Sequence, residues 1–324
     1  MKQNRFAWLS GAVALAGLLV TNTASADWTL NVGTALSSDD SHVESLLVMA
    51  ESVKSRTNGR LKLSILPANQ LGSVDDVMEQ ALAGSNVAVL TDGGRLASYV
   101  KELGILTCPY IADDANVTLK ITQTPTFASW VKELRKNGFQ VLAFNWWHGT
   151  RHLLTNKEIK SPDNLKGLRI RTAGTPTWME SIRAMGATPT PMPWTEVYPA
   201  MEQKVIDGAE AQTVAVWGSK LQEVVKYMTK TGHFNHVHGF VTGVKWFDGL
   251  PKDIQDILLD EWVKAGVEAS KNTAARIGVL EDKMRAAGMI INDIDTRPFR
   301  ERTAAVYTKL GYEDIRKKIL AEIK

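Results

Sequence analysis

The sequence of 324 residues contains a single cysteine and has almost no charge imbalance. Because Cys108 has no second thiol, no intramolecular disulfide and no zinc site of several thiolates can form. Lys and Arg total 38 against 35 for Asp and Glu, and the net charge of +3 is spread without a basic block. Nucleic-acid binding depends on a basic surface, so the composition argues against it.

Common catalytic motifs are also missing. The chain has no G-x-x-x-x-G-K-[ST] loop, no strand followed by G-x-G-x-x-G, no G-x-S-x-G and no H-E-x-x-H. His233, His236 and His238 lie close together, but in a strand only the last two share a face, and no carboxylate accompanies them. We therefore expect no cofactor and no bound metal.

The first 26 residues have the pattern of a secretory signal peptide. A short basic start precedes an apolar stretch, residues 6–20, and residues 24–26 are the small residues that signal peptidase requires. The apolar stretch is shorter than the ~20 residues that cross a bilayer, and no cysteine follows it for lipid attachment. We expect cleavage before Asp27 and a periplasmic protein.

The rest of the chain alternates helical and extended periodicity, which favours mainly parallel sheets covered by helices on both faces. The expected helices of the first unit are 41–57 and 73–84, and its expected strands are 61–65 and 87–90. A second unit begins near residue 140, with expected strands 141–145, 168–172 and 237–245 and expected helices 176–186, 195–203 and 219–228. The pattern predicts two α/β units.

Residues 251–288 predict either one long helix or two helices broken near Gly266 or Gly278. A continuous helix would be about 55 Å long, more than the diameter of a small domain. Such a helix would have to run across two domains.

Arg169 and Arg171 point to one side of the expected strand 168–172, just before a strand-to-helix connection. Open α/β sheets bind ligands at this end of a strand, and an arginine can hold a carboxylate with two parallel hydrogen bonds. A solvent-exposed pair is the alternative. The second unit is also rich in aromatic side chains, namely Trp146, Trp147, Trp178, Trp194 and Trp217, each a candidate for either the core or the site.

Three segments in order, 161–172, 186–198 and 205–210, resemble the signature of the solute-binding proteins of tripartite ATP-independent periplasmic (TRAP) transporters, the DctP-like family. The upstream segments 57–60, 70–72 and 149–152 are similar as well. The resemblance covers nearly the whole chain after the signal peptide. It implies an α/β, two-domain periplasmic binding protein of the Venus-flytrap type, with discontinuous domains and a long helix spanning both.

Boundaries and residue roles follow from this resemblance. Domain I is expected to comprise 27–148 and 237–276, and domain II 149–236 and 277–324. Arg171 resembles the family's carboxylate-binding arginine and Arg151 a second arginine that assists it. The family often has asparagine after its Asp-Gly-x-Glu element, whereas this chain has Ala211 and then Gln212 there. Further candidates for the cleft are Thr34, Thr91, Asp92, Trp194, Trp217 and His236.

The resemblance implies capture of a small carboxylate by cleft closure, without catalysis, by a monomer that delivers it to the small and large TRAP permease subunits. Because Ala211 leaves room and tryptophans can stack on a ring, we favour a sugar acid, such as a uronate, or an aromatic acid. The alternatives are a dicarboxylate receptor, a sensory receptor, or a periplasmic enzyme that uses Asp92, His148 or His236 as acid or base.

Overall fold

The computed structural model describes residues 27–112 and 114–323. The expected signal peptide therefore lies outside the described residues. None of the helices within these ranges combines the length and the apolar character needed to cross a bilayer.

The N-terminal part forms the predicted succession of strands and helices. Its elements are β1 (Trp28–Gly33), α1 (Ser41–Arg56), β2 (Leu61–Leu66), α2 (Val74–Ala83), β3 (Val87–Thr91), α3 (Gly93–Leu96), the 3₁₀ helix η1 (Lys101–Thr107), α4 (Ala115–Ile121) and α5 (Pro125–Lys136). The Asp40 side chain accepts a hydrogen bond from the His42 N–H at the start of α1. Ser73 and Asp76 form the capping box that begins α2, and the left-handed Gly84 ends this helix.

The remaining elements complete a second sheet and return to the first. They are β4 (Phe139–Thr155), η2 (Pro162–Leu165), β5 (Arg169–Thr172), α6 (Pro176–Met185), β6 (Thr188–Pro191), η3 (Trp194–Glu196), α7 (Val197–Glu202), β7 (Gly208–Gln212), α8 (Thr213–Gly218), η4 (Leu221–Glu223), β8 (Tyr227–Lys230), β9 (Asn235–Gly243), α9 (Val244–Phe247), α10 (Lys252–Ala286), β10 (Ile290–Asp293), α11 (Arg297–Thr303), α12 (Ala305–Leu310) and α13 (Glu313–Glu322). The predicted helix 219–228 is wrong. Only the short η4 forms there, and the last two residues begin the strand β8, which pairs with β4 and β10, so tertiary pairing overrides the local helical pattern.

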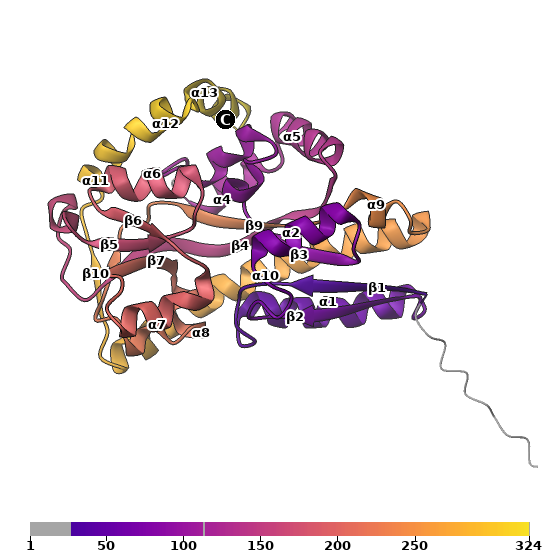
Figure 1. Ribbon diagram of the computed structural model, residues 1–324, viewed down its shortest axis with the longest axis horizontal. Coiled ribbons are helices and arrows are strands. Elements are labelled where there is room, and N and C mark those ends of the chain that lie inside the picture. Colours follow the sequence, from indigo (N-terminus) through magenta and orange to yellow (C-terminus); the bar gives the residue numbers. More distant parts are fainter. Residues whose placement is uncertain (1–26, 113, 324) are drawn as a thin grey trace, which may run out of the picture.

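The strands form one continuous path in the order β2-β1-β3-β9-β4-β7-β5-β6, with β8 also paired to β4 and β10 paired to β8. We call β1–β3 with α1, α2 and α3 the first lobe, and β5–β7 with α6–α8 the second lobe. Strands pair in parallel within each lobe, whereas β4 and β9 run antiparallel to their neighbours. Both strands continue from one lobe to the other, so they form the physical connection between the lobes (Figure 1).

The helix α10 is continuous over 35 residues, which is about 52 Å. It packs on α1 and β4 at one end and on α8 and β10 at the other, so it spans both lobes (Figure 1). Gly266 does not break it. A side chain there would lie 2.7 Å from Cδ1 of the buried Trp146, so glycine permits the close approach of this helix to β4.

The C-terminal helices also contact both parts of the molecule. The helices α11 and α12 pack on α6, and α13 packs on α4 and η1, so the chain arches across the top in Figure 1. Tyr307, Tyr312 and Ile319 belong to the hydrophobic core of the first lobe's sheet. The residue boundaries that we expect for the two domains remain a prediction.

Candidate binding site

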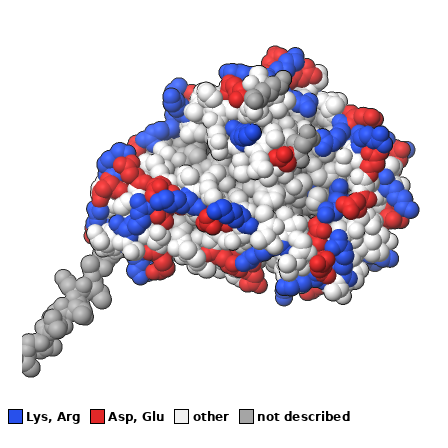
Figure 2. Space-filling model, turned by 180° about the vertical axis from the view of Figure 1, so that it is seen from behind, with Lys and Arg blue, Asp and Glu red and all other residues white. Residues whose placement is uncertain are grey.

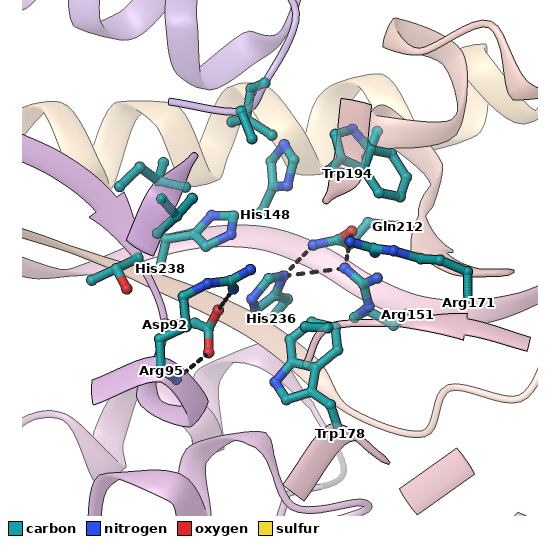
Figure 3. A pocket seen from close by; sticks show the side chains of 17 residues that line it. Asp92, Arg95, His148, Arg151, Arg171, Trp178, Trp194, Gln212, His236 and His238 are labelled. Carbon is teal, nitrogen blue, oxygen red and sulfur yellow. Dashed lines mark hydrogen bonds and ion pairs between the residues drawn. The ribbon is translucent and has the colours of Figure 1, made fainter. Parts of the chain in front are cut away.

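A cavity of about 70 Å³ lies between the two lobes, near the carboxyl ends of β3 and β5. The side chains around it come from both lobes and from the crossing strands β4 and β9 (Figure 3). They include Thr91, Asp92, Arg95, His148, Arg151, Arg171, Trp178, Trp194, Gln212, His236 and His238. The structure therefore brings together most of the residues that the sequence marked as candidates.

Arg171 is buried in the wall of the cavity. Its Nε and Nη2 donate hydrogen bonds to the carbonyl of Met192 at 3.1 and 2.7 Å, which fixes the guanidinium in place. Burial lowers the pKa of Arg171 to about 9, so it stays charged at neutral pH. Within the described residues, no aspartate or glutamate forms an ion pair with it. Arg171 is thus a fixed cation that can accept an anion.

Arg151 lines the same cavity, but a protein carboxylate already neutralises it. Its Nε donates to Oε2 of Glu210 and its Nη2 to the Glu210 carbonyl, while Nη1 donates to Oε1 of Gln212 at 2.7 Å. The guanidinium carbon also lies 4.5 Å from the ring centre of Trp178. Burial alone would raise the pKa of Glu210, but Arg151 and then His233 hold it below its ordinary value. Arg151 and Glu210 therefore form a buried ion pair.

Arg95, from the first lobe, is a cavity residue that the sequence did not single out. Its Nη1 donates to Oδ2 of Asp92 at 2.7 Å, and its Nε lies 3.5 Å from Oδ1 of Asp75. Asp92 also accepts the backbone N–H groups of Gly94 and Arg95 as the cap of α3. Asp92 is thus occupied by these contacts, and its ion pair neutralises Arg95.

Histidines form the middle of the site. His236 and His238 share one face of β9, as predicted, and their ring centres lie 4.1 Å apart, whereas His233 contacts Glu210 instead. Burial first, then Arg151 for His236 and His236 for His238, holds both pKa values well below 6.5, so both rings are neutral at neutral pH.

The tryptophans divide between two places. Trp194 lies 5.3 Å from the Arg171 guanidinium, and its Nε1 donates to Oγ of Ser219 at 3.0 Å. Trp217 lines a different hollow, where Nζ of Lys283 lies 5.6 Å from its ring centre.

Other candidates are placed as follows. Thr91 lines the cavity and donates to Sδ of Met78 at 3.5 Å. Thr34 and Ala211 are not among the residues that line it: the Thr34 hydroxyl accepts from the Leu36 N–H, and Ala211 is fully buried opposite His152. Gln212 lines the cavity, but its amide oxygen accepts from Nη1 of Arg151 and its amide nitrogen contacts Nδ1 of His236.

One group of described side chains, Asp40, His42 and His148, has ligand atoms within 4.8 Å of one another. These residues could hold a transition metal only if His148 gave up its hydrogen bonds to the Asp40 carboxylate, at 2.9 and 3.1 Å. Burial alone would raise the pKa of Asp40, but His148 and His42 lower it, so the pair is satisfied without an ion.

Comparison with known proteins agrees with this geometry. The family model of bacterial extracellular solute-binding proteins, family 7, matches residues 32–314. A TRAP periplasmic solute-binding protein from Ochrobacterium anthropi, with bound L-fuconate, is 34% identical with a TM-score of 0.89, over 92% of this chain and 100% of that chain. One from Escherichia fergusonii, in an apo open structure, is 38% identical with a TM-score of 0.81, over 91% and 99%. The 2,3-diketo-L-gulonate-binding periplasmic protein of Escherichia coli is 29% identical over 90% of this chain and 89% of its own length.

Fold and site thus define a two-domain TRAP-type periplasmic solute-binding protein with a long helix across both lobes, as the resemblance in the sequence implied. The chain belongs to family 7 of the bacterial extracellular solute-binding proteins, the DctP family. Proteins of this class are receptors rather than enzymes, and they bind small acids for membrane permease components.

Proposed function

We propose that this chain captures a monocarboxylic sugar acid in the periplasm, with the carboxylate on Arg171, and delivers it as a monomer to the small and large TRAP permease subunits. The observation that carries the proposal is the buried Arg171 guanidinium, which has no acidic partner among the described residues and faces a cavity between two lobes. A carboxylate can pair with it and offset the cost of desolvating both charges.

The charge count at the cavity favours one carboxylate rather than two. Three arginines line the cavity in the described part of the chain. Arg95 pairs with Asp92 and Arg151 pairs with Glu210, so Arg171 is the one of the three without an acidic partner. A dicarboxylate would bury its second charge against neutral histidines, which is costly without a cation. Binding of L-fuconate by the Ochrobacterium anthropi relative and the name of the Escherichia coli relative support a sugar acid over an aromatic acid.

The arrangement of the lobes supports capture by closure. Nδ2 of Asn69, after β2 in the first lobe, donates to Oγ1 of Thr195 beside Trp194 at 3.4 Å. The chain is also closer in shape to the relative with bound L-fuconate than to the apo open one, although it is more identical in sequence to the open one. We interpret the structure as the closed form, which a ligand that contacts both lobes would stabilise.

The test is a thermal-shift panel of the full mature chain with hexonates, D-glucuronate, benzoate, succinate and sn-glycerol 3-phosphate. A ligand that binds only the native state raises Tm by mass action. We expect a hexonate or the uronate to raise Tm most. A rise with succinate alone would favour the dicarboxylate receptor, and a rise with the phosphate ester alone would contradict carboxylate capture. Recovery of chemically unchanged acid would distinguish a receptor from an enzyme.

A further inference from the structure

Three histidines line the cavity, and the pattern of their hydrogen bonds points to a ligand with hydroxyl groups. We call His148, His236 and His238 the histidine wall. Figure 3 shows Arg171 at one side of the cavity and His238 at the other, with His236 between them. Each histidine of the wall has one buried ring nitrogen without a hydrogen-bond partner in the described part of the chain. Unpartnered buried polar atoms are rare in folded proteins and call for an explanation.

The hydrogen-bond network assigns the proton of His236. Nη1 of Arg151 donates to Oε1 of Gln212, so the amide nitrogen of Gln212 is directed at Nδ1 of His236. Arg151 and the Gln212 amide nitrogen are both donors, and both contact Nδ1. Nδ1 must therefore accept, and the ring proton lies on Nε2. His236 thus presents an N–H donor that no described protein atom satisfies.

His148 presents a second free ring nitrogen. Its Nε2 lies 2.9 and 3.1 Å from the two oxygens of the Asp40 carboxylate, which can only accept, so Nε2 carries a proton. No partner for Nδ1 of His148 is found within residues 27–112 and 114–323. The wall thus combines the free donor of His236 on β9 with the free Nδ1 of His148 on β4.

We propose that the histidine wall binds the hydroxyl groups of the acid whose carboxylate Arg171 holds, so that the site selects polyhydroxy monocarboxylates. A hydroxyl both donates and accepts, so a chain of hydroxyls can pair with the Nε2–H of His236 and with Nδ1 of His148 in either protonation state. A second carboxylate only accepts, and it would bury a further charge beside the neutral ring of His238. An alkyl chain satisfies neither nitrogen. This selectivity rests on the proposed function, because Arg171 must anchor the carboxylate.

The experiment compares acids of equal length by titration calorimetry of the mature chain. The probes are three hexonates (D-gluconate, L-galactonate and L-fuconate), hexanoate, which lacks hydroxyls, and adipate, which has a second carboxylate. We expect the best hexonate to bind at least ~100-fold more tightly than hexanoate and adipate, since sites built to bind hydroxyls strongly reject analogues that lack them. Hexanoate binding as tightly as every hexonate would overturn the wall but not the role of Arg171. Failure of all these acids to bind would overturn both.

Variants then locate the selectivity. His236→Phe removes the donor and should weaken binding of the best hexonate by about tenfold or more, with less than about threefold effect on hexanoate. His236→Gln keeps an N–H donor and should recover part of the loss. The matched control is His152→Gln, because His152 is also buried but lies away from the cavity, and it should leave the ratio unchanged. Equal losses for hexonate and hexanoate in His236→Phe would contradict the assignment.

Discussion

Arg151 and Arg171 are both buried in the wall of one cavity, yet their surroundings differ in one respect. Arg151 pairs with Glu210 on the neighbouring strand β7, so its charge is used by the fold. Arg171 is held by the Met192 carbonyl, which positions a cation without neutralising it. The comparison shows that the total number of arginines at a cavity does not predict the charge of the ligand. The number of arginines without an acidic partner in the protein predicts it.

Replacement of Arg171 should have the largest effect on ligand affinity, and it tests the comparison directly. In Arg171→Ala, the ligand carboxylate would lose its cation in a closed cleft, which should cost ~3–5 kcal/mol, or roughly a hundredfold to several thousandfold in Kd. The fold should remain, because Arg171 makes no ion pair with a described residue. Titration calorimetry with the tightest acid of the panel measures the loss.

Arg169 provides the matched control on the same strand. It is exposed and pairs with Asp207, with Nε and Oδ2 2.9 Å apart. Arg169→Ala should leave Kd unchanged within about twofold, since exposed ion pairs contribute little. An Arg171→Ala protein with wild-type affinity would remove Arg171 from the site.

Replacement of Arg151 should act on stability instead. Arg151→Met would leave the buried Glu210 carboxylate without its cation and should lower the free energy of unfolding by about 3 kcal/mol. Adding Glu210→Gln should recover much of the loss, because the second change removes the stranded charge. Urea unfolding followed by far-ultraviolet circular dichroism gives both values. An Arg151→Met chain as stable as wild type, but as weak in binding as Arg171→Ala, would make Arg151 a second anion anchor.

Local signals in the sequence were sufficient for much of the fold. The capping box at Ser73, the helix-ending Gly84 and the long apolar periodicity of α10 each act within one element, and the structure confirms them. The strand β8 was missed because its pairing with β4 and β10 is decided by segments more than 60 residues away in sequence.

The site was predictable only in part, for the same reason. Arg171 could be found because it precedes a strand-to-helix connection in a recognisable motif. Arg95 enters the cavity because the fold brings the start of α3 beside the second lobe, and no local pattern indicates this. Glu210 stood in the recognised Asp-Gly-x-Glu element, but its partner Arg151 lies 59 residues earlier on β4. The motif identifies Glu210, but only the pairing of β4 with β7 shows that Arg151 is its partner.

Buried histidines can be compared with the two buried arginines, because burial keeps His42 and His152 uncharged. Burial first, then His148 for His42 and His233 for His152, lowers both pKa values to about 3, against about 6.5 in an unfolded chain. Below pH 6.5 the unfolded chain binds protons that the folded chain does not, so stability should fall as pH decreases. At pH 5 each histidine should cost about 2 kcal/mol relative to pH 7.5.

Urea unfolding at pH 7.5, 6.5, 5.5 and 5.0 measures this dependence. His152→Gln should reduce the loss of unfolding free energy between pH 7.5 and pH 5 by the contribution of one histidine, because glutamine does not titrate. Stability that stays constant or rises as the pH falls to 5 would show that these rings are charged in the folded protein, and the neutral interior that we infer beside Arg171 would lose its support.

The smallest expected change in Kd comes from replacing Trp194, which we compare with Trp217 because the sequence could not distinguish the two. Trp194 lies over the Arg171 guanidinium and lines the cavity, whereas Trp217 lies over Lys283 in another hollow. Trp194→Phe keeps an aromatic ring but loses the stronger cation–π partner and the hydrogen bond to Ser219, so Arg171 should be held less firmly. Ligand binding should therefore weaken by about 0.5–1 kcal/mol, or two- to fivefold in Kd. Trp217→Phe should leave Kd unchanged, and the same calorimetric titration measures both. A larger loss for Trp217→Phe than for Trp194→Phe would place the ligand in the hollow beside Lys283, and would require the anion site to be sought there rather than at Arg171.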